Sequence, residues 1–221
     1  ESALTAYQQA IALNPNDAGT YNNLGTVFNQ LGQLAQAQDC YQQALFLNSN
    51  FAEAESNLGN TLLYQGMALK AIEHYQHVLA RQPIALIQSN LLFALHYTVD
   101  YELTTIFAEH QQYQQQYATP LAISIQPHLN DRQWQRKLKI GYLSADFKQH
   151  SVAYFMESVL AHHNAEQFEI FCYYNGTIND EVTERFKQYA DHWINCVGLS
   201  DDGLATQIRS EPIDILIDLS G

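Results

Sequence analysis

The side chain with the clearest chemical potential is that of His150, which lies between an apolar run, 139–143, and a segment with helical apolar spacing, 152–162. The run suits a buried strand, and the later segment predicts a helix that Ser151 caps. A strand that feeds a helix through a polar turn is half of a βαβ unit, where ligands gather at the carboxyl ends of strands. An imidazole there can exchange protons or hold a polar substrate. His150 is therefore a candidate catalytic residue; the alternative is a structural histidine beside the helix cap.

Asparagine recurs at one position in the first part of the chain. Asn23 and Asn57 are separated by 34 residues, and Asn90 lies 33 residues further on. An asparagine amide offers both a donor and an acceptor, so it can bind one peptide unit of an extended chain without contacting that chain's side chains. A row of such amides would hold peptides of many sequences. Spacing alone leaves open the alternative that these are solvated surface side chains.

The remaining histidines and the cysteines predict no metal centre. His74 and His77 are three residues apart on an expected helix, but no Cys, Asp or Glu completes a ligand spacing, so a solvated pair is favoured. The three cysteines lie far apart without a CxxC motif, which is typical of reduced thiols in a cytoplasmic protein. Cys172 and Cys196 fall in apolar runs, where a thiol behaves as a small buried hydrophobe.

Charge and hydropathy exclude two classes of partner. The net charge is −13, with only ten Lys and Arg residues among 221. Binding to nucleic acid needs clustered basic side chains, so nucleic acid is not expected as a partner. The chain also has no apolar stretch long enough to span a membrane and no signal-peptide pattern, so no membrane partner is expected.

The elements that must position these residues fall into three segments. Residues 1–85 repeat with a period of 34, which is typical of tetratricopeptide repeats and predicts stacked helix pairs with a concave binding face. The repeat is carried by recurring tyrosines, glycines, alanines and leucines: Tyr7, Tyr41, Tyr75; Gly25, Gly59; Gly32, Gly66; Ala37, Ala71; Leu24, Leu58. Residues 86–135 keep helical periodicity at first and then lose it, which predicts an adaptor that covers the last repeat, followed by a linker.

Residues 136–221 alternate between strand and helix patterns. Expected strands are 139–143, 168–174, 192–197 and 213–219, and expected helices are 152–162, 180–190 and 201–209, the last capped by Ser200. This order predicts a parallel sheet with helices on its faces. No G-x-G-x-x-G motif follows the first strand, so no dinucleotide-phosphate loop is expected.

The order of these segments resembles the protein O-GlcNAc transferase family, the SPINDLY-like glycosyltransferases with tetratricopeptide repeats. The resemblance is carried by the repeats, by SNLLFALHY and KIGYLSADFKQHSVAYF, and by FEIFCYYN, ADHWINCVGLSDDGLATQIRS and IDILIDLSG. It implies a GT-B architecture of two Rossmann-like lobes with the active site between them. It also implies UDP-N-acetylglucosamine as the donor and Ser or Thr hydroxyls, on peptides held by the repeat groove, as acceptors.

The resemblance also implies roles for particular residues. His150 matches a histidine of the active-site cleft, whereas Asn23, Asn57 and Asn90 match a peptide-binding ladder of asparagines. Asp146 matches the edge of the same loop and is a second catalytic candidate. Asp214, in the expected last strand, is a further catalytic candidate, although most exposed carboxylates are only solvated.

The resemblance implies that residues 136–221 form only one incomplete Rossmann-like lobe. The chain opens inside a repeat and stops directly after a strand, so we expect it to be a fragment of a longer protein. The lobe that binds the UDP diphosphate would lie beyond Gly221. The fragment is therefore expected to bind no cofactor and to be inactive alone. The alternative to a glycosyltransferase is a non-catalytic scaffold that binds peptides in its repeat groove.

Overall fold

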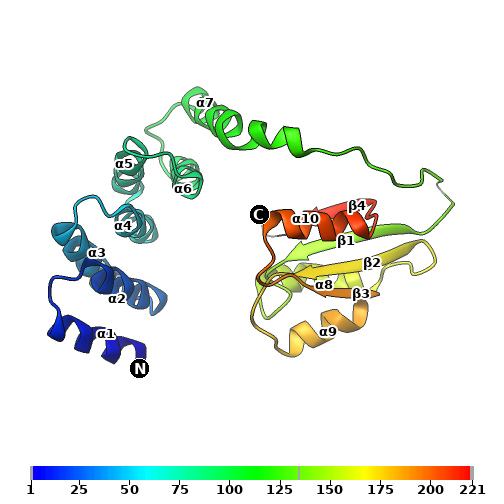
Figure 1. Ribbon diagram of the computed structural model, residues 1–221, viewed down its shortest axis with the longest axis horizontal. Coiled ribbons are helices and arrows are strands. Elements are labelled where there is room, and N and C mark those ends of the chain that lie inside the picture. Colours follow the sequence, from blue (N-terminus) through cyan, green and yellow to red (C-terminus); the bar gives the residue numbers. More distant parts are fainter. Residues whose placement is uncertain (1, 134, 220–221) are drawn as a thin grey trace. The chain divides into compact units, whose positions relative to one another are not determined.

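The computed structural model describes residues 2–133 and 135–219, which belong to two compact units, Glu1–Ile125 and Gln126–Gly221 (Figure 1). The first unit is helical and the second is built around a sheet. This is the fold class that the repeat period and the strand–helix alternation predict.

The first unit consists of stacked helices. They are α1 (Ser2–Leu13), α2 (Ala18–Gln30), α3 (Leu34–Leu47), α4 (Ala52–Tyr64), α5 (Ala68–Leu79), α6 (Ala85–Leu95) and α7 (Leu103–Tyr113). A π-helical segment (Gln114–Ala118) and a 3-10 helix (Thr119–Ser124) follow. Each helix packs on the next, and α4 additionally contacts α2 and α6. The first helices of successive pairs therefore form one row.

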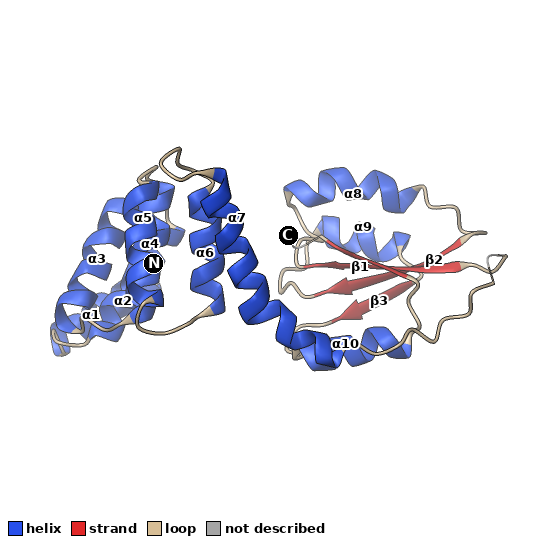
Figure 2. Ribbon diagram, turned by 90° about the horizontal axis from the view of Figure 1, so that it is seen from above, coloured by secondary structure: helices blue, strands red, loops and turns tan. Residues whose placement is uncertain are grey.

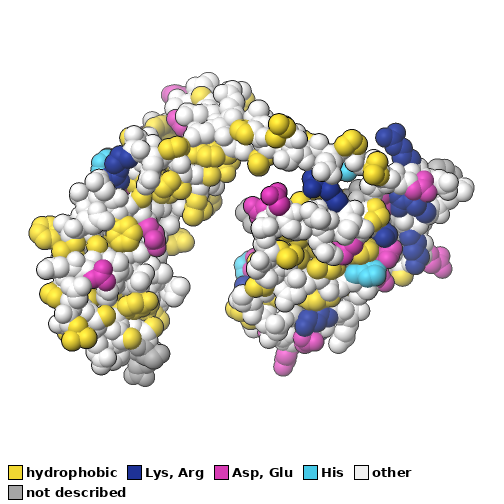
Figure 3. Space-filling view, viewed as in Figure 1, with side chains coloured by type: hydrophobic (Ala, Val, Ile, Leu, Met, Phe, Trp, Pro, Cys, Tyr) yellow, Lys and Arg dark blue, Asp and Glu magenta, His cyan; other side chains and the backbone are white. Residues whose placement is uncertain are grey.

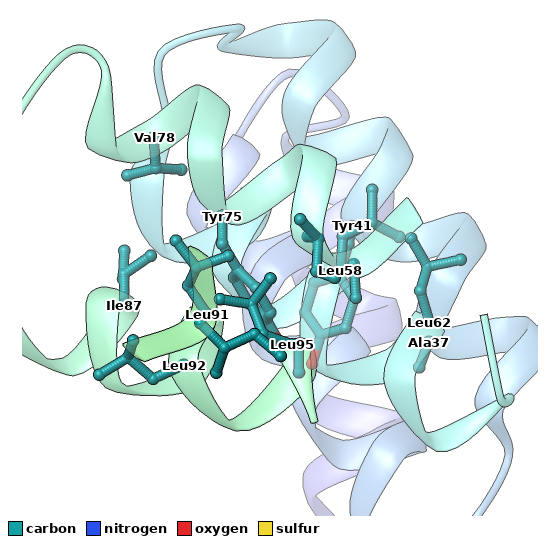
Figure 4. Packing of buried hydrophobic residues seen from close by; sticks show 14 residues of the cluster. Ala37, Tyr41, Leu58, Leu62, Tyr75, Val78, Ile87, Leu91, Leu92 and Leu95 are labelled. Carbon is teal, nitrogen blue, oxygen red and sulfur yellow. The ribbon is translucent and has the colours of Figure 1, made fainter. Parts of the chain in front are cut away.

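Small residues and tyrosines fix the spacing within each helix pair. Tyr41 and Tyr75 are fully buried, and a Cβ atom added to Gly25 or Gly59 would lie 2.7 or 2.6 Å from a carbon of the ring. Only glycine permits so close an approach. Figure 4 shows these tyrosines among the aliphatic side chains that join the repeats to α6.

Helices α6 and α7, which form the expected adaptor, complete this core. Five residues of α6 are buried in the cluster, together with Ile106 of α7: Ile87, Leu91, Leu92, Ala94 and Leu95. The two helices occupy the part of the chain where the 34-residue pattern fades. They bury the apolar face that the last repeat would otherwise expose to water.

The second unit contains a four-stranded parallel sheet of order β3-β2-β1-β4. Its strands are β1 (Leu138–Ser144), β2 (Phe168–Tyr174), β3 (His192–Asn195) and β4 (Ile215–Asp218). Its helices are α8 (Ser151–Ala161), α9 (Glu181–Tyr189) and α10 (Asp201–Ser210). In Figure 2, α8 and α9 lie on one face of the sheet and α10 lies on the other.

Most boundaries agree with the expected ones, and β2 agrees at both ends. The third and fourth strands are shorter than expected, because pairing in the sheet ends at Asn195 and begins only at Ile215. Ser200 caps α10 as predicted, accepting a hydrogen bond from the Gly203 N–H.

The thiols behave as small hydrophobic groups. Cys172 and Cys196 are buried among the strands, and all three cysteines are free. Burial raises the pKa of the Cys172 thiol to about 12.

Apolar side chains also remain on the surface of both units, as the space-filling view shows for one face (Figure 3). Tyr154 and Phe155 on α8 are examples. Scattered exposure of this kind is ordinary in soluble domains. No helix in the described ranges is long and apolar enough to cross a membrane.

Candidate functional site

The loop between β1 and α8 carries His150 and is fixed at three points. Phe147 is fully buried against the rings of Phe186 and Trp193. The Ser144 Oγ accepts a hydrogen bond of 2.9 Å from the Asp146 N–H. At the other end of the loop, the Gln149 N–H donates to Asp180 Oδ2 at 2.8 Å. These contacts hold the loop at the carboxyl end of β1.

His150 is itself the N-cap of α8, which corrects the expectation that Ser151 caps this helix. Its backbone is extended, and its Nδ1 accepts a hydrogen bond of 3.3 Å from the Val152 N–H. The ring therefore imitates a capping asparagine. Because Nδ1 must offer a lone pair in this contact, the proton of the neutral ring lies on Nε2.

The His150 ring is not turned into the interior, since 41% of its side chain is exposed. Asp146 lies beside it, with Oδ2 3.6 Å from His150 Nδ1 and Oδ1 3.3 Å from Lys148 Nζ. The arrangement can donate a hydrogen bond from Nε2 to a polar ligand.

Asp214 lies at the other end of the sheet. Its Oδ2 accepts from the N–H of Lys139, near the start of β1, whereas His150 follows the end of that strand. Both carboxylate oxygens also bind the Arg136 guanidinium at 2.5 Å, and Asn130 adds a bond of 2.9 Å. The Arg136 hydrogen bonds hold the pKa of Asp214 well below its usual range. Asp214 therefore does not lie near His150. Its carboxylate joins the segment before β4 to Arg136 and to the start of β1.

The three asparagines of the predicted ladder lie on helices of one row. Asn23 is on α2 and exposed, whereas Asn57 on α4 and Asn90 on α6 are half-buried. The Asn57 Nδ2 donates to Asn22 Oδ1 at 3.0 Å, and the Asn90 Nδ2 donates to Asn60 Oδ1 at 3.3 Å.

Sequence reasoning missed Asn22 and Asn60. A signal was present for Asn60, because it follows Asn57 by three residues and so shares a helix face with it. Asn22 directly precedes Asn23 and had no such signal. Its partner lies 35 residues away.

His74 and His77 have a carboxylate between them, which corrects the expectation of a solvated pair without one. Glu55 Oε1 lies 2.5 Å from His77 Nδ1 and 3.6 Å from His74 Nδ1, and Glu55 Oε2 is paired with Arg81. Within residues 2–133 and 135–219, no group of three or more His, Cys, Asp or Glu side chains could hold a metal ion. The contacts of Glu55 with His74 and His77 join α4 to α5.

The described chain joins a row of repeat helices to a parallel α/β unit, and the family-model matches place this combination in the class of repeat-containing glycosyltransferases. The model of glycosyl transferase family 41 matches residues 96–221, and models of tetratricopeptide repeats match residues 1–32 and 18–51. The chain belongs to glycosyl transferase family 41.

Individual proteins show the same relationship. An O-GlcNAc transferase mutant of Thermobaculum terrenum has a similar solved structure, with a TM-score of 0.90 and 29% identity over 98% of this chain and 42% of that one. The probable UDP-N-acetylglucosamine–peptide N-acetylglucosaminyltransferase SEC of Arabidopsis thaliana is 38% identical over 87 residues. That match covers 39% of this chain and 9% of the relative. The SPINDLY protein of Oryza sativa is 36% identical over 90 residues, which are 39% of this chain and 10% of that protein.

These comparisons confirm the family resemblance carried by the sequence motifs. The chain spans less than half the length of the similar solved structure. The matched segments cover about a tenth of the two plant relatives.

Proposed function

We propose that this chain is the acceptor-side part of an enzyme that transfers N-acetylglucosamine from UDP-GlcNAc to Ser or Thr hydroxyls of peptides. The observation that carries the proposal is the match to an O-GlcNAc transferase structure over 98% of this chain. The family 41 match over residues 96–221 supports the transferase class. The repeat unit would hold the acceptor along α2, α4 and α6, and the strand end at His150 would face the reacting groups.

The proposed reaction needs a hydroxyl oxygen to attack the anomeric carbon while the bond from that carbon to the UDP oxygen breaks. The electron pair of the broken bond stays on the UDP phosphate, and the hydroxyl proton passes to a base or through water to an oxygen of that phosphate. The tautomer of His150 favours a donor role, because Nε2–H can bond to an oxygen of the substrate. A base role would require the ring to exchange its Val152 contact for a hydrogen bond from Nδ1–H to Asp146, which would free Nε2 to accept a proton.

We propose further that residues 1–221 alone have no turnover and bind no donor firmly. The chain spans 42% of the similar O-GlcNAc transferase structure, which leaves room for a second lobe in the relative. A cytoplasmic location is part of the proposal and is supported by the three free thiols.

The test uses the polypeptide as its natural gene encodes it, with radiolabelled UDP-GlcNAc and a Ser/Thr peptide. We expect transfer of label, and we expect His150→Ala to reduce kcat/KM by about a hundredfold or more. His150→Asn is the matched control, because asparagine keeps an acceptor for the α8 cap but lacks the ring. If His150→Asn retains full transfer, His150 acts only as a cap.

The alternative function is a peptide-binding scaffold without catalysis, and the aligned amides of Asn57 and Asn90 are the observation in its favour. Under this alternative the natural polypeptide binds the peptide but transfers no sugar. Mass spectrometry of the peptide after incubation with UDP-GlcNAc distinguishes the two, because each transferred sugar adds the mass of one N-acetylglucosamine residue.

A further inference from the structure

A second row of amides lies behind the ladder asparagines. Asn57 donates its Nδ2–H to the side-chain oxygen of Asn22, and Asn90 donates its own to the side-chain oxygen of Asn60. In both cases the acceptor lies on the preceding helix of the row, α2 for Asn57 and α4 for Asn90. The two ladder amides therefore turn their nitrogen atoms toward the preceding repeat.

The orientation of Asn57 follows from a carboxylate. Glu53 Oε1 accepts a hydrogen bond of 3.0 Å from Asn22 Nδ2. An ionised carboxylate can only accept, so Asn22 must present its NH2 group to Glu53 and its oxygen to Asn57. Asn57 must then present its own NH2 group to Asn22. Because Asn22 is only 1% exposed, water cannot easily replace either partner.

Asn90 donates to Asn60 in the same direction, although a tyrosine hydroxyl and not a carboxylate lies behind this acceptor. The Asn60 oxygen accepts two hydrogen bonds, one of 2.6 Å from the Tyr75 hydroxyl and one of 3.3 Å from Asn90 Nδ2. A carbonyl oxygen has two lone pairs, so both are used. Tyr75 is fully buried and holds the first of these contacts in place.

We propose that Asn22 and Asn60 are positioning residues that set the orientation of the ladder amides at Asn57 and Asn90. Among the described residues, neither ladder amide uses its oxygen or its second N–H in another side-chain hydrogen bond, and both amides donate toward the preceding helix of the row. Such a row fits an extended peptide backbone, whose N–H and C=O groups must meet an acceptor and a donor in fixed order. The inference rests on the proposed peptide groove and adds the residues that fix the direction of its donor and acceptor groups.

The test exchanges the donor and acceptor roles of Glu53 and Asn22. In Glu53→Gln the residue can also donate, so Asn22 and Asn57 lose their forced orientation. In Asn22→Asp two carboxylates face each other across the contact and repel. In the double variant, glutamine at 53 donates to aspartate at 22, which accepts again from Asn57. The net charge of the double variant equals that of the wild type.

Two measurements are made on the 221-residue chain. The first is the affinity for a fluorescein-labelled unstructured peptide of Ala, Ser and Thr, by fluorescence anisotropy. We expect each single variant to bind about three to ten times more weakly, and the double variant to return to within about twofold of wild type. The second is the hydrogen-exchange rate of the Asn57 side-chain amide by NMR, which we expect to rise in Glu53→Gln and to fall back in the double variant.

The outcomes separate this inference from the proposed groove. Glu73→Gln, which changes an exposed carboxylate of α5, is the control and should leave both measurements unchanged. If Asn57→Ala leaves peptide binding intact, the groove at this position is refuted, while Asn57 amide exchange still tests the positioning. If Asn57→Ala weakens binding but the double variant stays as weak as Glu53→Gln, the positioning role is overturned.

Discussion

The two units of this chain connect their polar groups over different sequence distances. In the repeat unit, the amides of Asn22 and Asn57 are 35 residues apart, and Glu55 pairs with Arg81 across 26 residues. In the α/β unit, Asp214 pairs with Arg136 across 78 residues. Among the described residues, the side-chain hydrogen bonds of the repeat unit span at most 35 residues, whereas those of the α/β unit span up to 84, from Asn130 to Asp214.

This difference predicts different responses to mutation. A repeat array is stabilised by a sum of interfaces between neighbours, so a local defect stays local unless it removes a central side chain. The first and last strands of the sheet are joined by backbone pairing and by the Arg136–Asp214 ion pair, so loss of this pair should destabilise the sheet as a whole. The following substitutions test that contrast, in order of decreasing effect.

The largest effect is expected for Tyr75→Ala in the repeat unit. Tyr75 is fully buried against Gly59 and α6, and loss of a large core aromatic costs about 3–5 kcal/mol. Hydrogen exchange followed by mass spectrometry should show lost protection in α4–α6 and unchanged protection in β1 and β2. Tyr64→Ala, at a position 69% exposed, is the control and should change little. Equal loss of protection in both units would show that they unfold together.

A smaller effect, about 2 kcal/mol, is expected for Asp214→Asn in the α/β unit. The Asp214 side chain is only 9% exposed, and the variant leaves Arg136 without its carboxylate. Chemical denaturation at neutral pH should show the loss in the α/β unit alone. Asp131→Asn changes an exposed carboxylate in the same part of the chain and should shift stability by no more than about 0.5 kcal/mol.

The pH dependence of Asp214 has a definite sign. Its pKa is lower in the folded state than in the unfolded state, so its contribution is full above the unfolded pKa of about 4. As pH falls below that value toward the folded pKa, the contribution is lost. The stability difference between wild type and Asp214→Asn should therefore be constant from neutral pH down to about 5 and should shrink in stronger acid. A difference that persists unchanged into strong acid would exclude the charge as its source.

The same contrast explains what the sequence could predict. The 34-residue period predicted the stacked helix pairs, because tyrosines and small residues recur in the same pattern, but it did not predict that Tyr41 and Tyr75 pack on Gly25 and Gly59. The alternation of strands and helices predicted the parallel sheet. Neither pattern carries information on pairs such as Arg136 and Asp214, and Asp214 therefore looked like a free carboxylate and a catalytic candidate.

Two local contacts also differ from the predictions made from the sequence: the cap of α8 and the partner of His74 and His77. Ser151 has the common type for an N-cap, but the His150 ring reaches the Val152 N–H and takes that place. Glu55 could not be connected to His74 and His77 from spacing, because it lies on the preceding helix. The roles of the candidate residues in a reaction or in peptide binding stay predictions: His150, Asp146, Asp214, Asn23, Asn57 and Asn90.

The smallest effects compare one helix cap from each unit. Asp17 caps α2 by accepting from the Gly19 and Thr20 N–H groups, and Asp180 caps α9 by accepting from the Thr183 N–H. Replacement of either by alanine should cost about 1 kcal/mol, measured by denaturation. The two caps differ in one respect, since Asp180 also accepts from the Gln149 N–H next to His150.

Asp180→Ala should therefore change the environment of His150, whereas Asp17→Ala should not. The readout is the NMR chemical shift of the His150 ring carbon between its two nitrogens, followed across its titration. We expect a shifted signal in Asp180→Ala, because the loop loses one of its three anchors. An unchanged signal would show that Phe147 and Ser144 hold the loop by themselves. The position of His150 would then depend on the packing of Phe147 against Phe186 and Trp193 and not on the hydrogen bond to Asp180.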